Sequence, residues 1–189
     1  MEVKKHDPGH AFFREDCLLK KTKLSLKRLV FLAILVAINI ILQKISFGPA
    51  YLKVGLGFIG LSLLGLYSGP IWGSIGAGIS DLAMSALFGV EGGFFPGFTL
   101  SAMLAAGIYG CFFYKKPLKI WRIVVATILV TIIVNICLNT YWLHLLYGLN
   151  LKAAFTQRLI KEAIVPWIQM IIIYLVFDAL QRVKIVNKF

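Results

Sequence analysis

Polar side chains stand at helical spacing inside an apolar stretch late in the chain. Steps of four, four and three residues place four of them on one face of a helix: Thr131, Asn135, Asn139 and Trp142. An amide in hydrocarbon needs hydrogen-bond partners, from a neighbouring helix or from a ligand. Two amides beside an indole suit a flat polar ring, which needs edge hydrogen bonds and a stacking surface. Tyr141 and Trp142 are also typical of the membrane interface, so both interpretations stay open.

A single carboxylate, Asp81, lies deep in another apolar stretch. Burying an ionised carboxylate in a membrane is costly, so this side chain must face the protein interior or water, and it must have partners. One role is structural, with bonds to Ser80, Ser85 or the backbone of a neighbouring helix. The other is ligand recognition, because a carboxylate accepts two parallel N–H bonds from an amino-substituted heterocycle.

Two cations, Arg158 and Lys161, stand where the last apolar stretch begins. One interpretation places them at the membrane surface, where long basic side chains extend into water. The other turns them inward to meet an anion. Glu162, Val165 and Gln169 continue the same predicted helix face. A negatively charged ligand would require the inward arrangement.

Small residues stand four apart in the first apolar stretch, at Ala33 and Ala37. This spacing puts both methyl groups on one helix face and lets another helix approach closely. Such pairs are also common by chance, so the spacing alone indicates a packing face without saying what packs there.

The motifs of several enzyme classes are absent from the sequence. There is no GxxxxGK[ST] phosphate loop, no HExxH, and no Cys or His spacing typical of a metal site. We also expect no pair of carboxylates inside the membrane for acid–base or two-metal chemistry. The sequence therefore predicts a protein that is not an enzyme and needs no cofactor or metal.

The composition predicts a membrane protein. Hydrophobic residues make up 59% of the 189 and charged residues 15%, whereas a soluble domain has about 25% charged residues. A membrane helix needs roughly 20 mostly apolar residues, and the apolar runs predict six such helices in an all-α, polytopic fold. The expected spans are 28–45, 51–67, 71–88, 98–114, 120–146 and 159–180. They form a membrane domain over 28–182, between a basic N-terminal arm, 1–27, and a C-terminal tail, 183–189.

The basic residues predict the orientation. With six spans and the N-terminus inside, fifteen of the 20 Lys and Arg residues fall on the cytoplasmic side. Such an excess is typical of cytoplasmic segments, so both termini are expected to be cytoplasmic. The net charge of +12 gathers at the ends of apolar segments. We therefore expect contact with membrane lipid and no binding of nucleic acid, which would need a basic groove with stacking aromatics.

With these features assembled, the chain resembles the substrate-binding S components of energy-coupling factor (ECF) vitamin transporters of the bacterial cell membrane. The resemblance covers about 29–180 and includes the pair Ala33 and Ala37, the run 45–70, and Asp81 after a glycine-rich segment. Within this family the chain is most similar to the folate-specific branch. That similarity rests on Phe95-Pro96-Gly97-Phe98-Thr99-Leu100-Ser101 and Asn139-Thr140-Tyr141-Trp142-Leu143.

The resemblance implies a function and a set of site residues. An S component captures its vitamin from outside and delivers it inward together with a transmembrane coupling subunit and two ATP-binding-cassette ATPases. Folate would be bound by Asn135, Asn139, Tyr141, Trp142, Asp81 and Thr99, with Arg158 and Lys161 meeting its glutamate carboxylates. Ala33 and Ala37 would contact the coupling subunit.

Three alternatives remain open at this stage. The chain could be an S component for riboflavin, thiamin, pantothenate or a pyridoxine-like compound. It could be a self-sufficient secondary transporter, or a membrane scaffold or enzyme that transports nothing. Competition among ligands, transport without any ATPase, and the absence of a tight small-molecule ligand would identify these cases in turn.

Overall fold

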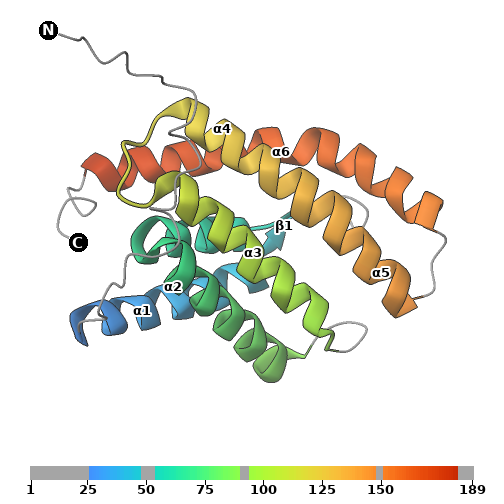
Figure 1. Cartoon of the computed structure of the whole chain (residues 1–189), viewed down its shortest axis with the longest axis horizontal. Coiled ribbons are helices and arrows are strands. Elements are labelled where there is room, and N and C mark those ends of the chain that lie inside the picture. Colours follow the sequence, from blue (N-terminus) through green and yellow to red (C-terminus); the bar gives the residue numbers. More distant parts are fainter. Residues whose placement is uncertain (1–25, 48–53, 90–93, 148–150, 183–189) are drawn as a thin grey trace, which may run out of the picture.

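The computed structural model describes residues 26–47, 54–89, 94–147 and 151–182, and this part of the chain is helical apart from one short hairpin (Figure 1). The elements are α1 (Leu26–Lys44), β1 (Ser46–Phe47), β2 (Val54–Gly55), α2 (Gly57–Phe88), α3 (Pro96–Phe113), α4 (Ile120–Leu129), the π-helix η2 (Val130–Leu138), α5 (Asn139–Tyr147) and α6 (Leu151–Arg182). The predicted N-terminal arm, up to residue 25, and the C-terminal tail lie outside the described residues.

Five of the described helical segments are long and apolar enough to cross a membrane. They are Leu26–Lys44, Gly57–Phe88, Pro96–Phe113, Ile120–Leu146 and Lys161–Leu180. The third of the expected spans has no separate helix among them, because it is joined to the second within α2. The prediction of an all-α, multi-pass membrane protein is confirmed at this level.

Helix α2 is divided by a sharp turn at Gly69, which lies between Ser68 and Pro70. Gly69 has φ +80° and ψ −179°, a conformation that only glycine adopts readily. A Cβ placed on Gly73 would lie 2.9 Å from the carbonyl oxygen of Leu64, although nine residues of straight helix span roughly 13 Å. The two arms of α2, 57–68 and 70–88, therefore fold back on each other, as the Ser-Gly-Pro turn predicts.

The segment before α2 differs from its prediction. Ser46 pairs with Gly55 and Phe47 with Val54 in an antiparallel hairpin, and the amide of Leu56 donates to the carbonyl of Ile45 at 3.0 Å. The expected second span was to begin at residue 51, but the first arm of α2 begins at Gly57. The pairing of β1 with β2 therefore precedes α2, and the helix of the second span begins later than we expected.

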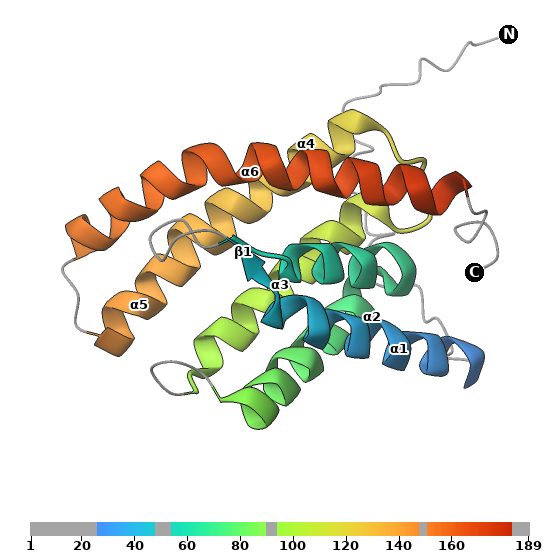
Figure 2. The same ribbon diagram turned by 180° about the vertical axis from the view of Figure 1, so that it is seen from behind.

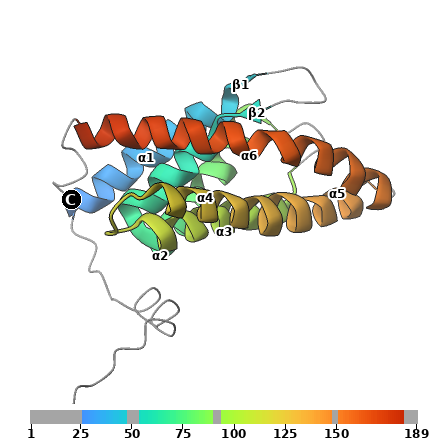
Figure 3. The ribbon, with the colours of Figure 1, turned by 90° about the horizontal axis from the view of Figure 1, so that it is seen from above.

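The helices form two groups that lie against each other. α1 and α3 pack on the two arms of α2, while α4, η2 and α5 form one long rod along which α6 runs (Figures 1 and 2). Seen from above, α6 and this rod run side by side, and α1, α2 and α3 lie between and behind them (Figure 3). α2 and α3 approach so closely at Gly65 that an added Cβ there would lie 2.6 Å from the amide nitrogen of Gly110. The missing side chain of Gly65 permits this approach.

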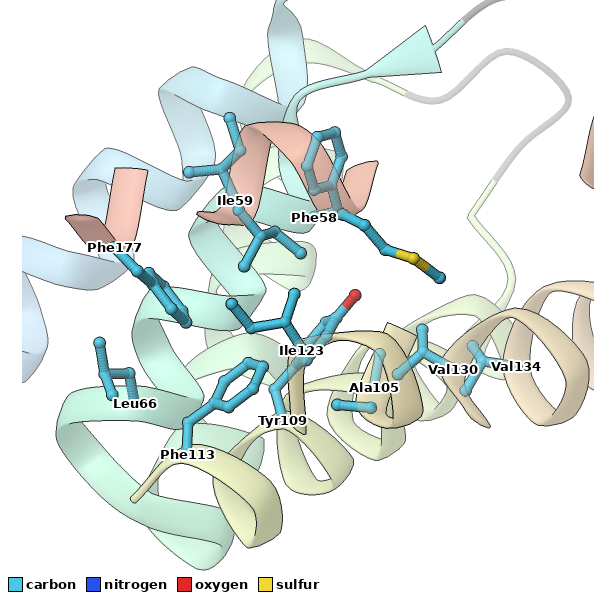
Figure 4. Packing of buried hydrophobic residues seen from close by; sticks show 13 residues of the cluster. Phe58, Ile59, Leu66, Ala105, Tyr109, Phe113, Ile123, Val130, Val134 and Phe177 are labelled. Atoms are coloured by element: carbon cyan, nitrogen blue, oxygen red, sulfur yellow. The ribbon is translucent and has the colours of Figure 1, made fainter. Parts of the chain in front are cut away.

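Aromatic side chains join the two groups at one end of the molecule. Phe113 of α3 stacks on Tyr109 at 5.6 Å between ring centroids and meets Phe177 of α6 edge-on at 5.1 Å. Ile123 of α4 belongs to the same buried cluster (Figure 4). The beginning of α1, the beginning of α4 and the end of α6 all lie at this end (Figures 1 and 2).

The rod contains one feature that the sequence did not predict. Residues 130–138 form a π-helix, in which the amide of Asn139 donates to the carbonyl of Val134, five residues back. We expected an uninterrupted α-helix over 120–146. π-helical turns are rare and often occur at functional sites, and Val130, Val134 and Asn135 of this one line the cavity described next.

Candidate functional site

A cavity of about 400 Å³ lies between the two groups of helices and borders the Phe113 cluster at Tyr109. This volume lies in the range of roughly 300–1,000 Å³ that small-molecule sites occupy. Its polar lining residues are Gln43, Asp81, Ser101, Tyr109, Asn135, Asn139, Lys161, Glu162 and Gln169. Its apolar walls include Phe58, Leu61, Phe98, Ala105, Val130, Val134 and Val165. Each of the five membrane-spanning segments thus contributes to one site of mixed polarity.

Asp81 has a structural partner and faces the cavity as well. The hydroxyl of Thr99 donates to its Oδ2 at 2.7 Å, and the hydroxyl of Ser85 donates to its backbone carbonyl at 2.8 Å. Ser80, which we considered as a partner, instead accepts from the side-chain amide of Asn39. The structural and ligand-binding interpretations of Asp81 are therefore compatible, since a carboxylate has acceptor sites beyond the one that Thr99 uses.

The two amides of the rod both line the cavity. Asn135 donates from Nδ2 to Oε2 of Glu162 at 3.1 Å, which joins η2 to α6 across one wall. Asn139 lies one turn further along, and its Oδ1 is buried with no hydrogen-bond partner among the described residues. A buried acceptor of this kind is costly to leave unsatisfied. The site therefore offers an orphan acceptor that a ligand N–H could satisfy.

Two carboxylates line the same cavity. Asp81 approaches from α2 and Glu162 from α6, and Lys161 lines the cavity beside Glu162. The inward arrangement of Lys161 is the one found.

The predicted aromatic residues occupy different places. Trp142 donates from its indole nitrogen to the hydroxyl of Ser101 at 3.1 Å, so it stands behind Ser101 and does not line the cavity itself. Tyr141 lies against Trp142, with 5.3 Å between centroids, and is 50% exposed. Among the described residues the rings that line the cavity are Phe58, Phe98 and Tyr109.

Trp142 nevertheless fixes the entrance of α3. Its ring lies 5.6 Å from that of Phe95, and both pack on Gly97. A Cβ on Gly97 would come within 2.4 Å of the Phe95 ring and 2.6 Å of Trp142. Glycine at this position lets α3 begin directly beneath the two rings, which places Phe98 and Ser101 along the cavity and Thr99 against Asp81.

The remaining predicted residues lie elsewhere. Arg158 belongs to α6, but its side chain lies outside the described part of the structure. Ala33 and Ala37 are exposed on α1, and only 11% of this span is buried, the smallest share of the five. The face of α1 that carries them is therefore left uncovered by the described part of the chain.

Several cavity residues were missed from the sequence. Gln43, in the last turn of α1, packs its Cγ 3.0 Å from the position of a Cβ on Gly57. Glu162 and Gln169 were recognised as one helix face but not as site residues. An isolated amide within an apolar segment is the signal that would have identified Gln43 and Gln169. Within the described ranges no group of three or more His, Cys, Asp or Glu side chains is arranged to hold a metal.

Comparison with known proteins agrees with this arrangement. The sequence profile of the family described as "ECF transporter, substrate-specific component" matches residues 27–184. The chain is 36% identical over 161 residues to "Folate transporter FolT" of Clostridium novyi (strain NT), covering 85% of this chain and 93% of that protein. It is 35% identical over 162 residues to the "Folate transporter FolT" of Leuconostoc mesenteroides, covering 82% and 87%.

A solved structure is also similar. "Crystal structure of FolT bound with folic acid" superposes with a TM-score of 0.75 at 39% sequence identity, over 82% of this chain and 95% of that one. The profile match spans nearly the whole described fold, including every helix that lines the cavity. This chain therefore belongs to the family of substrate-specific components of ECF transporters.

Proposed function

We propose that this chain is the folate-binding S component of an ECF-type vitamin importer. The observation that carries the proposal is the cavity itself, which combines carboxylates, amides, a lysine and aromatic rings in a volume suited to one small molecule. The likeness to a structure bound with folic acid, and to two folate transporters, supports folate as the ligand.

The chemistry of folate matches the lining of the cavity. A pterin ring presents an amino group and ring N–H groups along one edge and acceptors along others. Asp81, held by Thr99, would accept from that edge, and Asn135 and Asn139 would complete the hydrogen bonds. Phe58 and Phe98 offer ring faces against which the pterin could stack.

The glutamate end of folate is anionic and requires cations. Lys161 lines the cavity, and Arg158 precedes it by one turn on α6, so both would meet the glutamate carboxylates. Tyr141 and Trp142 would act from behind the wall, by holding Ser101 and the beginning of α3 in place. Charge-assisted hydrogen bonds of this kind contribute roughly 1.5–3 kcal/mol each.

We propose six membrane crossings with both termini cytoplasmic. The two arms of α2 would be the second and third crossings. The first arm is about 18 Å long, so the β1–β2 hairpin before it would complete the crossing. The excess of Lys and Arg at the opposite end supports placing the cavity toward the outside.

Transport would require partners that supply the energy. The exposed face of α1 with Ala33 and Ala37 would dock on a transmembrane coupling subunit that carries two ATPases. The small side chains would let a partner helix approach closely.

Equilibrium binding of folate to the purified chain, measured by calorimetry without any ATPase, tests the proposal. Tight binding at a ratio of one to one is the expected result. Binding of riboflavin or thiamin instead would retain the family and refute the ligand. Uptake into liposomes along an ion gradient, with no partner present, would favour a secondary transporter.

A further inference from the structure

A second cavity, of about 450 Å³, lies at the opposite end of the molecule from the candidate binding site. It is formed where α4 begins and α6 ends, and we refer to it as the α4–α6 cavity. Its lining residues are Leu118, Lys119, Ile120, Trp121, Ile123, Tyr174, Phe177 and Asp178. Among the described residues none lines both cavities, and the buried Phe113–Phe177 contact lies behind the second one.

Positive charge is concentrated around the α4–α6 cavity. The segment 115–122 carries Lys115, Lys116, Lys119 and Arg122. The contacts found for three of these cations are to neutral groups. Lys116 donates to the carbonyl of Cys111 at 2.7 Å, Arg122 donates to the carbonyl of Pro117 at 3.2 Å, and Lys115 lies 5.2 Å from the centre of the Tyr114 ring.

Few of the described carboxylates balance the positive charge at this cavity. Asp178 is the one carboxylate that lines it among the described residues, and Arg182 pairs with this carboxylate at 2.9 Å. Lys119 therefore stands at the cavity without a carboxylate of its own in the described part of the chain. The cavity has a net positive environment and would attract an anion.

The rim of the cavity is apolar and faces outward. Ile120 is 63% exposed, and Trp121 and Tyr174 are exposed by 43% and 45%. Trp and Tyr are enriched where a membrane protein crosses the interface between hydrocarbon and headgroups. Ile171 and Leu175 continue the exposed apolar surface along α6. An occupant would therefore meet cations in the cavity and hydrocarbon beside it.

We propose that the α4–α6 cavity binds the headgroup of an anionic phospholipid, whose acyl chains lie along the exposed surface of α6. Basic pockets between membrane helices on the cytoplasmic side are suited to such headgroups, and this side follows from the orientation proposed above. A free phosphate would use the same cations but would gain nothing from Trp121, Tyr174 and the apolar rim. The apolar rim therefore favours the lipid.

The test uses the full chain in nanodiscs of phosphatidylcholine with a minor fraction of phosphatidylglycerol, and native mass spectrometry to count the lipids retained. Wild-type protein is expected to retain phosphatidylglycerol selectively. Lys119→Gln should weaken this retention about fivefold, the effect of one basic residue near an anionic surface. Lys116→Gln is the matched control, since Lys116 lies in the same segment but does not line the cavity.

A second variant is expected to increase the retention of phosphatidylglycerol. Asp178→Asn removes the negative charge from the cavity and releases Arg182, so it should strengthen the retention of phosphatidylglycerol several-fold. A merely destabilised protein would not give such a gain. Folate binding, measured on the same samples, should be unchanged in Lys119→Gln and Asp178→Asn, so a failure of the folate proposal would be seen separately.

Three results would overturn the inference. The first is equal retention of phosphatidylglycerol and phosphatidylcholine by the wild type. The second is equal retention of phosphatidylglycerol by the wild type and both cavity variants. The third is displacement of the lipid by inorganic phosphate at comparable concentration, which would identify a site for free phosphate.

Discussion

The hydroxyl of Thr99 donates a hydrogen bond of 2.7 Å to Oδ2 of Asp81 and so joins the first turn of α3 to the second arm of α2. This bond holds a carboxylate at the wall of the cavity in a fixed orientation. It also supplies a partner that Asp81 needs in the membrane whether or not a ligand is present. Its consequence for ligand affinity can be measured directly.

Replacing Thr99 by valine keeps the shape of the side chain and removes the donor. We expect Thr99→Val to weaken folate binding roughly tenfold, because hydrogen bonds to charged groups are worth about 1.5–3 kcal/mol and each 1.4 kcal/mol is a factor of ten. Calorimetry of the purified variant measures this. Thr99→Ser retains the hydroxyl and should bind nearly as the wild type does. Equal affinities for all three proteins would mean that the Thr99–Asp81 hydrogen bond takes no part in binding.

The bond from Asn135 to Glu162 predicts a similar pair of outcomes on the opposite wall. Glu162→Ala removes the acceptor at 3.1 Å from Asn135 Nδ2 and leaves the amide without this partner, so folate binding should fall by roughly tenfold. Glu162→Gln keeps an oxygen acceptor and should lose less. If Glu162→Ala and Glu162→Gln lose the same folate affinity, the negative charge of Glu162 contributes to binding and its hydrogen bond to Asn135 does not.

The cations of α6 are expected to recognise the glutamate end of folate alone. Lys161→Ala and Arg158→Ala should each weaken folate binding at least about tenfold. Pteroate, which lacks the glutamate, provides the control ligand, and its affinity should be the same for the variants and the wild type. Loss of affinity for pteroate as well would place these side chains at the ring or show a general disturbance of the site.

Gly97 predicts an effect on stability as well as on binding. An added methyl group would come within 2.4 Å of the Phe95 ring, and forcing extra volume into packed side chains costs about 1–3 kcal/mol. Gly97→Ala should therefore lower the midpoint of thermal unfolding and weaken folate binding. Gly55→Ala is the control for stability, because nothing lies within 4 Å of its added Cβ. Equal unfolding midpoints for both variants would show that the Phe95 and Trp142 side chains can shift without a measurable loss of stability.

The sequence could predict those features that follow from local chemistry. Apolar runs gave the membrane helices, and Ser68-Gly69-Pro70 gave the turn, because only glycine reaches φ +80° at no cost. The amide face of Asn135 and Asn139 was identified because hydrocarbon offers amides no partners. These signals are visible without knowing which helices are neighbours.

Features that depend on neighbouring helices could not be predicted. The β1–β2 hairpin and the π-helix at 130–138 depend on tertiary contacts that outweigh local propensity. The displacement of Trp142 from the cavity follows from a partner, Ser101, that lies 41 residues away in the sequence. Gln43 and Glu162 were missed as site residues for the same reason, since only the packed bundle turns them toward Asp81.

The exposed face of α1 predicts a separation between binding and transport. Ala33 is exposed and far from the cavity lining, so Ala33→Trp should leave folate affinity of the isolated chain unchanged. A bulky indole would prevent close approach of a partner helix, and uptake in cells that contain the coupling subunit and ATPases should be lost. Ile132→Trp is the matched control, because Ile132 is 49% exposed on the rod, away from the proposed docking face. If uptake survives Ala33→Trp and fails in Ile132→Trp, the docking face lies on the rod and not on α1.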